Sequence, residues 1–465
     1  MNEQKLQQYL AKYPRTHATY SEAPFLSRRR FFQIAGAGVS ASYLSQPLLA
    51  QAQRAPVITR NTAKNVIFVL MTGAPSHVDT FDCKITAATP AALKAETVNG
   101  VLWPNGVMPK LGQQLGKIAI VRSMRAWALV HSLGQTWTQI GRNPAAALGD
   151  VSPNMGSVVA SEKDRDRTAS QVFPTFLALN ANGAMGPGYF SATYAPFKVA
   201  PATTGLPNTS NADGKTRSDA RLRFLHTIDD PLRVSSPLGK TAEDFDKFYA
   251  SANGMMFNSA VDTAFKYSSA DSQRYGAGGV STSFGNACLV AKQVLTANQG
   301  TRFIQINLGG WDMHNDIYGT AGAAVNILTL GNVFDSGMSA LIADLDAAGL
   351  LKETLIVMVG EFGRTTGALS GSGGRDHYLQ HFSAFAGAGV KGGKIIGATN
   401  STGSDVSNFG WSHDRYVRPE DVMATVYSAM GIDWTKQLDT PFGRTFEYVP
   451  DASDGIYAPI DELWT

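Results

Sequence analysis

Residues 65–71 read Asn-Val-Ile-Phe-Val-Leu-Met, a run in which every residue after the first is apolar. Such an unbroken run predicts a β-strand buried on both faces, because a strand with one wet face would show a polar residue at every second position. Strands of this kind occur mainly in parallel sheets that helices cover on both sides. The run therefore predicts an α/β fold with a mostly parallel sheet.

Shorter apolar runs along the chain predict five further strands. They lie at residues 118–121, 176–179, 303–308, 355–359 and 383–386. Between the third and fourth of these, apolar residues recur at helical spacing from Met338 to Leu345, and Gly349 follows where a C-terminal cap is expected. Another helix is predicted from Pro419 to Gly431. Strands alternating with helices predict a three-layer α/β/α sandwich.

The composition favours one large domain and no surface for nucleic acid. With 465 residues, 44% of them hydrophobic and 17% charged, the chain can bury a large core, and residues 53–465 are predicted to form a single domain. The formal net charge of +3 arises in the first 52 residues, which hold six basic and two acidic residues. The remainder carries 34 basic against 35 acidic residues, so no basic patch for nucleic acid is expected.

Residues 1–52 carry the pattern of an export signal. Residues 27–32 read Ser-Arg-Arg-Arg-Phe-Phe and precede a weakly apolar stretch, and Ala-Gln-Ala at 50–52 fits a small-residue cleavage site. This predicts a twin-arginine signal peptide, passage through the twin-arginine export machinery, and a periplasmic or secreted location. The alternative is a membrane anchor, but glycines, serines and Pro47 interrupt a run that falls short of the roughly 20 apolar residues a span needs.

Residues 183–239 are rich in Gly, Pro, Ser, Thr and Asn and hold few apolar runs. This composition predicts a long insertion over the sheet. The insertion would be either a lid that faces substrate or a plain surface loop.

The two cysteines, Cys83 and Cys288, lie far apart and lack CxxC spacing, which argues against a thiolate metal site. Each is expected to be a small buried hydrophobe. An oxidising periplasm would also permit one disulfide between them.

Three clusters of acids and histidines lie between residues 309 and 381. They read GGWDMH at 309–314, GEFGR at 360–364 and GRDHYLQH at 374–381. Their carboxylates and imidazoles are ligand types that bind zinc, manganese or calcium. We therefore predict one or two divalent metal ions, held by Asp312, His314, Glu361, Asp376 and His377.

These clusters fall where an open α/β sheet binds ligands, outside the carboxyl ends of its strands. Asp312 and His314 follow one predicted strand, and Glu361 follows the next. Asp312 could instead cap a helix, and Glu361 could pair with Arg364. His377 could be a hydrogen-bonded core histidine. The joint placement of the clusters favours a site.

Two further histidines have open roles. His381 lies four residues after His377, so on a helix the two rings would share a face and could bind one ion. In a loop, His381 would only orient a neighbouring group. His131 could point into the same cleft, although a lone histidine is usually structural.

The segment after the strand at 65–71 could supply the other half of a site. It reads TGAPSHVDTFD at residues 72–82. Here Asp79 would be a metal carboxylate, and Ser76 or Thr80 would be the hydroxyl that attacks a phosphate or sulfate ester. The alternative is a turn in which Asp79 and Ser76 cap the following segment.

The motifs, in this order, resemble a family of exported bacterial proteins, domain of unknown function family 1501. The resemblance covers nearly the whole chain after residue 52 and includes GAPSHVDTFD, GGWDMH, GEFGR, GRDH, the segment VKGGKIIGAT and the helix ATVYSAMGI. It implies a fold of the alkaline phosphatase-like superfamily. That superfamily includes phosphatases, sulfatases and phosphomutases with one or two divalent metals over a mostly parallel sheet.

The resemblance also implies roles residue by residue. Asp312 and His314 would match the ligands of one metal, and Asp79 would match an N-terminal carboxylate. Glu361 would match an Asp that completes the other metal, and His377 a late His ligand.

The chain departs from the superfamily pattern at two positions. It has Thr72-Gly73 where an Asp usually follows the first strand, and Glu361-Phe362 where an Asp-His pair is usual. Both departures leave the nucleophile and a second metal open.

The expected function is that of an exported, metal-dependent hydrolase of phosphate or sulfate esters, acting on a small-molecule or glycan ester. Arg364 or Arg375 would clamp the anion. The alternative is a non-catalytic binding or assembly protein of the cell envelope that keeps the fold. A carbohydrate-processing enzyme using Asp/Glu pairs would leave the histidines without a role.

Overall fold

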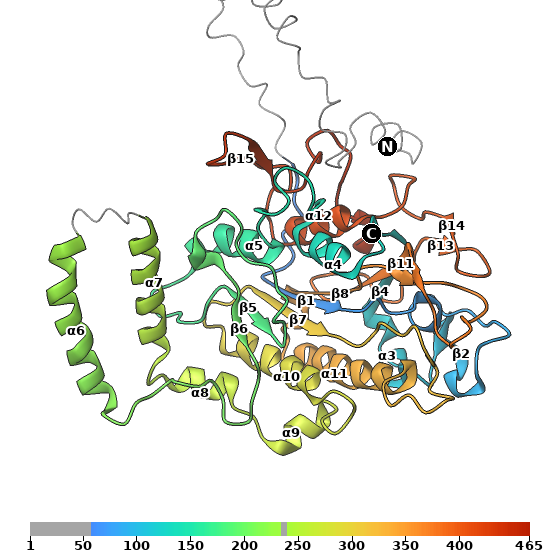
Figure 1. The fold of residues 1–465 in the computed structure, drawn as a ribbon, viewed down its shortest axis with the longest axis horizontal. Coiled ribbons are helices and arrows are strands. Elements are labelled where there is room, and N and C mark those ends of the chain that lie inside the picture. The colour runs from blue at the N-terminus through green and yellow to red at the C-terminus, as the bar shows by residue number, and fades with distance from the viewer. Residues whose placement is uncertain (1–56, 234–239) are drawn as a thin grey trace, which may run out of the picture.

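A computed structural model describes residues 57–233 and 240–465. Its centre is an eight-stranded sheet with the strand order β12-β4-β11-β8-β1-β7-β5-β6 (Figure 1). The strands are β1 (Asn65–Met71), β4 (Ile118–Arg125), β5 (Phe176–Leu179), β6 (Phe197–Val199), β7 (Phe303–Leu308), β8 (Thr354–Val359), β11 (Gln380–Ala386) and β12 (Ile395–Ile396). The predicted signal peptide at residues 1–52 lies outside the described residues.

The sheet is mostly parallel, as predicted. β1 pairs in parallel with β7 and β8, and β5 pairs in parallel with β6 and β7. β11 runs antiparallel to both of its neighbours, β4 and β8, whereas β12 is parallel to β4. Among these eight strands, β11 alone therefore runs in the opposite direction.

The alternation of side chains along β1 explains why the strand is apolar throughout. Ile67, Val69 and Met71 belong to the hydrophobic core on one face of the sheet. Val66, Phe68 and Leu70 belong to the core on the other face. Because both faces are buried, a polar side chain in this strand would lose its contacts with water without gaining a partner.

Helices cover both faces, so the three-layer α/β/α architecture is confirmed. Figure 1 shows α4, α5 and α12 on one side of the sheet and α3, α10 and α11 on the other. The helices are α3 (Pro109–Gly112), α4 (His131–Ile140), α5 (Met155–Lys163), α8 (Ser259–Phe265), α9 (Ser269–Arg274), α10 (Thr282–Ala297), α11 (Ile327–Ala347) and α12 (Pro419–Ala429). Both predicted helices are present. Gly349 and Gly431 follow them with positive φ angles of 68° and 71°, as a left-handed cap requires.

Short elements decorate the sandwich. Four two-stranded ribbons pair β2 (Ala95–Val98) with β3 (Val101–Pro104), β9 (Gly363–Arg364) with β10 (His377–Tyr378), β13 (Ala398–Thr399) with β14 (Val406–Asn408), and β15 (Gln437–Asp439) with β16 (Thr445–Glu447). Short 3-10 helices are η2 (His77–Asp79), η3 (Ala91–Leu93), η4 (Leu115–Lys117), η5 (Asp164–Asp166), η6 (Ala192–Tyr194), η7 (Leu351–Glu353) and η8 (Asp461–Leu463).

The predicted insertion is partly helical, where the sequence analysis expected a lid or a loop. Its second half contains α6 (Gly214–Arg233), which forms a hairpin with α7 (Lys240–Met255). In Figure 1 this hairpin stands beside the sheet edge that carries β6, not over the sheet. The sequence pattern did not indicate this helix, because its apolar residues are few and lie among charged ones.

Both cysteines are free thiols in the described structure, and both are buried. They lie in the same hydrophobic core as Ile67 and Val69. Burial raises the pKa of the Cys83 thiol to about 12, so it behaves as a small apolar side chain. No helix in the described part of the chain has the length and apolar character needed to cross a bilayer.

Candidate metal centre

Three histidines and one aspartate converge at the carboxyl edge of the sheet. Asp312 and His314 follow β7, and His131 begins α4, shortly after the end of β4. His377 precedes β11, and the antiparallel direction of β11 brings its start to this same edge. One ligand atom from each of the four side chains lies within 4.8 Å of the others. We call these four residues the metal cluster.

The Nε2 atoms of the three histidines face a common centre. Those of His131 and His314 lie 3.1 and 3.0 Å from Asp312 Oδ1. The Nε2 of His377 lies 3.6 Å from the same oxygen and 3.0 Å from the Nε2 of His314. These spacings leave room for one ion bound to three nitrogens and one oxygen, a donor set typical of zinc.

Each of the three rings has its other nitrogen fixed by an acceptor. His131 Nδ1 lies 2.8 Å from Glu361 Oε1, and His314 Nδ1 lies 2.8 Å from Asp376 Oδ1. His377 Nδ1 donates to the carbonyl oxygen of Leu129 at 2.7 Å. Metal-binding histidines are usually oriented in this way, with Nδ1–H bonded to a carboxylate or carbonyl and a lone pair left on Nε2.

A positive charge between the converging lone pairs would stabilise them, beyond the contact that Arg364 Nη1 already makes with His314 Nε2 at 3.3 Å. Two neutral imidazole nitrogens 3.0 Å apart would otherwise present lone pair to lone pair. The Nε2 of His131 is buried, and it faces Asp312 Oδ1 at 3.1 Å. Burial lowers the pKa of His377, which favours the neutral ring. These observations fit a bound cation.

Charge balance agrees with a divalent ion. Asp312, Glu361 and Asp376 contribute three negative charges beside the single positive charge of Arg364. One divalent cation would neutralise the remainder, because a buried or half-buried excess of charge is costly. Two extra protons on the histidines would do the same, and the hydrogen bond that His131 donates to Glu361 does raise the pKa of His131. Metal and protons therefore compete for this site.

Arg364 is fully buried and holds the site together, although it was predicted to clamp an anion. Its Nη2 donates to Asp312 Oδ1 and to the carbonyl of Gly73, both at 2.5 Å. Its other nitrogens donate to the carbonyls of Ala74 and Arg375 at 2.9 and 3.1 Å. Burial opposes ionisation of Asp312, but the hydrogen bond and charge of Arg364 lower its pKa to about 2. Arg364 is thus fully occupied inside the protein.

Glu361 acts through His131, whereas the sequence analysis predicted a direct ligand. Its Oε1 accepts from the backbone N–H of Gly73 at 2.8 Å and from Gln135 Nε2 at 3.0 Å, besides holding His131. Its Oε2 is buried without a hydrogen-bond partner among the described residues, so any direct ligand role rests on that oxygen alone. Asp376, also predicted as a ligand, has an exposed side chain and contacts the cluster through His314.

The predicted N-terminal half of the site is not brought to the cluster. Asp79 is fully buried, and its carboxylate accepts from Ser76 Oγ at 2.6 Å, Arg375 Nε at 2.8 Å and Tyr318 O–H at 2.7 Å. Thr80 Oγ1 donates to the carbonyl of Ser76 at 2.7 Å. Asp79 is therefore placed as the partner of a buried arginine, and the Ser76 and Thr80 hydroxyls as internal donors. The structural alternative describes this segment better.

Arg375 is likewise committed. Besides Asp79, it donates to the carbonyls of Thr365 and Gly367 and to the hydroxyl of Tyr318. Its side chain is fully buried. Neither predicted arginine is therefore free to hold a substrate anion.

Two histidines, His381 and His131, differ from their predicted roles. His381 lies in β11 and is buried, so the helical pair with His377 was wrong. His131, for which both a place in the cleft and a structural role were considered, joins the cluster. The signal that could have identified it is its position shortly after the strand at 118–121, the same placement that singled out Asp312 and His314.

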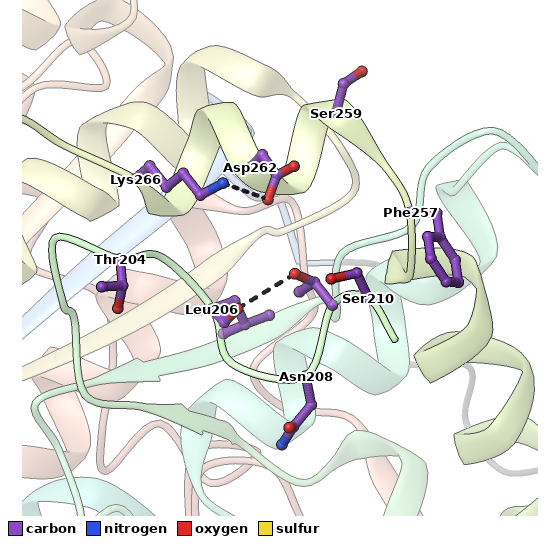
Figure 2. A pocket seen from close by; sticks show the side chains of 9 residues that line it. Thr204, Leu206, Asn208, Ser210, Phe257, Ser259, Asp262 and Lys266 are labelled. Atoms are coloured by element: carbon purple, nitrogen blue, oxygen red, sulfur yellow. Dashed lines mark hydrogen bonds and ion pairs between the residues drawn. The ribbon is translucent and has the colours of Figure 1, made fainter. Parts of the chain in front are cut away.

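A cavity elsewhere in the structure lacks this convergence. It measures about 560 Å³ and is lined by residues near the base of the α6–α7 hairpin, among them Asp262 and Lys266, which form an ion pair of 3.2 Å. Figure 2 shows that the side chains of Thr204, Asn208 and Ser259 point in different directions around it. It therefore does not compete with the metal cluster as a catalytic site.

The cluster predicts stoichiometric metal. Purified protein should bind about one divalent ion per chain, with zinc preferred over calcium because three donors are imidazoles. His131→Ala should lose most of this metal, since it removes a donor that converges on the centre. Elemental analysis after dialysis measures the content. His226→Ala, which changes an exposed histidine on α6, is the matched control and should keep the metal. Equal metal in both variants would contradict the assignment.

Removing a group that orients a ligand should weaken the metal without abolishing its binding. Glu361→Gln keeps the size of the side chain but weakens the acceptor for His131 Nδ1, so the metal dissociation constant should rise about 10- to 100-fold. Competition titration against a zinc chelator measures the change. Asp405→Asn, at an exposed carboxylate that contacts Arg125 and Tyr416, serves as the control. An unchanged affinity in Glu361→Gln would show that the His131 contact has no orienting role.

Burial of His381 predicts acid sensitivity. Burial lowers the pKa of His381 from 6.5 to about 3, so the unfolded chain binds a proton that the folded chain excludes. The free energy of unfolding should therefore fall as the pH drops from about 6.5 towards 3, by up to about 1.4 kcal/mol per pH unit from this group. Urea denaturation across this range should show a shallower slope for His381→Gln than for the unchanged protein. Parallel curves would rule out this contribution.

The fold has remote likenesses among solved structures. A sulfatase from Pseudoalteromonas sp. is 12% identical, with 80% of this chain and 68% of that chain covered and a TM-score of 0.38. An alkaline phosphatase from the Antarctic bacterium TAB5 is 12% identical, with 79% and 98% covered and a TM-score of 0.33.

Two sequence comparisons complete the picture. A search of curated proteins finds no match. The family model described as "Protein of unknown function (DUF1501)" matches residues 63–456, which include the whole metal cluster. The chain therefore belongs to the DUF1501 family, as its motifs indicated.

Proposed function

We propose that this protein is a metal-dependent hydrolase of phosphate or sulfate esters. The observation that carries the proposal is the convergence of three Nε2 atoms and one carboxylate oxygen. The Nδ1 atom of each of the three rings forms a hydrogen bond on the side away from this centre. A structural ion would be enclosed, yet the side chains of Asp312 and His314 are 47% and 38% exposed. An ion held by an exposed set is accessible to substrate, which is a property of catalytic rather than structural sites.

The four cluster residues would hold the ion, and the surrounding residues would keep them in place. When bound, the ion would act as a Lewis acid towards an ester oxygen and offset the charge of the transition state. Glu361 and Asp376 fix the rings of His131 and His314, and Arg364 fixes Asp312. This preorganisation lowers the cost of ordering the site during the reaction. The described residues form one such cluster, which supports one ion rather than two.

The nucleophile in this proposal is a water molecule. Ser76 and Thr80 are buried, and their hydroxyls donate to other groups of the protein. A side-chain nucleophile needs an exposed oxygen within reach of the ester, which neither residue provides. Transfer directly to water would proceed in one displacement and invert the configuration of a chiral phosphate ester.

The location and substrate class also belong to the proposal. Residues 27–32 support export by the twin-arginine machinery and action in the periplasm or outside the cell. The open cluster is compatible with an ester of a small molecule or of a glycan. A non-catalytic envelope protein is the second candidate, supported by the absence of a predicted hydroxyl nucleophile from the described cluster.

Ester hydrolysis tests the proposal. The unchanged protein, loaded with zinc or manganese, should hydrolyse aryl phosphates or aryl sulfates. Asp312→Asn should lower kcat/KM by more than about 100-fold, because it weakens a ligand and its contact with Arg364. The control Asp405→Asn should retain activity.

Two outcomes would decide against the enzyme. If the metal-loaded protein turns over no ester of a panel of phosphates, sulfates and phosphonates, the second candidate, a non-catalytic envelope protein, replaces the hydrolase. If Asp312→Asn is as active as the unchanged protein, the activity does not arise at this cluster.

A further inference from the structure

Three buried amide side chains bond to one another between α4, α5 and the sheet. They are Gln139 of α4, Gln305 of β7 and Asn154 at the N-cap of α5, and none is more than 3% exposed. Asn154 Nδ2 donates to Gln139 Oε1 and to Gln305 Oε1, both at 3.2 Å. Gln305 Nε2 donates to Gln139 Oε1 at 3.0 Å. We call these three residues the amide cluster.

Two backbone donors fix the direction of the hydrogen bonds in the amide cluster. The N–H of Gly156 donates to Asn154 Oδ1 at 2.7 Å, so the other end of this amide is the donor. The N–H of Met185 donates to Gln139 Oε1 at 3.0 Å. Gln139 Nε2 therefore points the other way and donates to the carbonyl oxygen of Gln135 at 3.1 Å. Each amide thus has a single orientation.

The hydrogen bonds continue along α4 to the metal cluster. His131, Gln135 and Gln139 recur at intervals of four residues, so they share one face of the helix. Gln135 Nε2 donates to Glu361 Oε1 at 3.0 Å, and the same oxygen lies 2.8 Å from His131 Nδ1. A path of polar contacts through Gln135 therefore leads from the amide cluster to a ring of the metal cluster.

The amide cluster occupies a place where apolar side chains would also fit. Gln305 pairs in register with Phe68 of β1, which belongs to the hydrophobic core on this face of the sheet. Replacing hydrogen-bonded partners with apolar groups of the same shape can leave stability nearly unchanged. Apolar contacts, however, tolerate small shifts of a helix, whereas a fully bonded network of amides specifies one arrangement. The cluster therefore fixes position more than it adds stability.

We propose that the amide cluster and Gln135 are positioning residues, which set the spacing of His131 and Asp312 in the metal centre. β7 carries Gln305 and leads to Asp312, while α4 begins at His131 and carries Gln139. The bond between Gln305 and Gln139 thus holds two ligand-bearing elements against each other. This inference rests on the metal centre of the proposed function, and the residues that it names act through other side chains.

Metal affinity and ligand geometry test the proposal in the full chain. Gln139→Met keeps the length of the side chain but removes its hydrogen bonds, so α4 should lose its fixed alignment. The zinc dissociation constant should rise about 10-fold in a competition titration against a chelator. The visible absorption spectrum of the cobalt-loaded protein, which depends on ligand geometry, should change as well. Urea denaturation checks that the variant is folded under the conditions of the titration.

Gln114→Met is the matched control. Gln114 is half-buried against α11, and its Nε2 also donates to a backbone carbonyl, that of Ser339, at 2.8 Å. This variant loses a comparable hydrogen bond in another part of the fold. It should keep both the zinc affinity and the cobalt spectrum of the unchanged protein.

A second variant separates positioning from general loosening of the core. Gln135 is only half-buried, so Gln135→Met leaves the amide cluster in place and removes the contact with Glu361. It should raise the zinc dissociation constant about 10-fold in the unchanged chain, but hardly at all when Glu361→Ala is already present. A merely structural effect would give the same factor in both backgrounds and would overturn the proposal.

The remaining outcomes are equally decisive. Unchanged zinc affinity and cobalt spectrum in both Gln139→Met and Gln135→Met would overturn this inference and leave the metal centre intact. Absence of stoichiometric metal from the unchanged protein would overturn both. Neither readout needs ester turnover, so a protein that binds metal without hydrolysing esters would refute the hydrolase and still test the positioning.

Discussion

The buried guanidinium of Arg364 joins the chain segments on which the site depends. It binds the carbonyls of Gly73 and Ala74 after β1, the carboxylate of Asp312 after β7, and the carbonyl of Arg375. A buried guanidinium without such acceptors would carry an unpaired charge at a cost of about 3–5 kcal/mol. The loops at the carboxyl edge are therefore fixed relative to one another before any ion arrives.

Hydrogen bonds from neighbouring loops also hold the histidines of the cluster. Glu361 binds His131 and also the backbone N–H of Gly73, so the loop after β1 helps to set a histidine of α4. Asp376 performs the corresponding role for His314. Carboxylates that look like ligands in the sequence thus serve as supports for imidazoles, and the supports raise the basicity of the rings they hold.

The fold was predictable because its central strand is buried on both faces, and such a strand has to be apolar throughout. It was predictable that Asp312, His314 and His377 lie close together, because ligand sites gather at the carboxyl edge of a sheet. The pairing of Asp79 with Arg375 was not predictable, since the two residues are 296 positions apart in the sequence and only the fold brings them together. His131 lacked a neighbouring acid in the sequence, and its acid, Glu361, is 230 residues distant. The α6–α7 hairpin was missed because charged residues conceal its narrow apolar stripes.

X-ray absorption spectroscopy of the metal-loaded protein tests the central claim most directly. The account predicts one ion bound by three imidazole nitrogens and one carboxylate oxygen, at about 2.0–2.1 Å if the ion is zinc. Multiple scattering from the outer ring atoms would identify the histidines. A coordination sphere of oxygens alone, or one with sulfur from Cys83 or Cys288, would contradict the account.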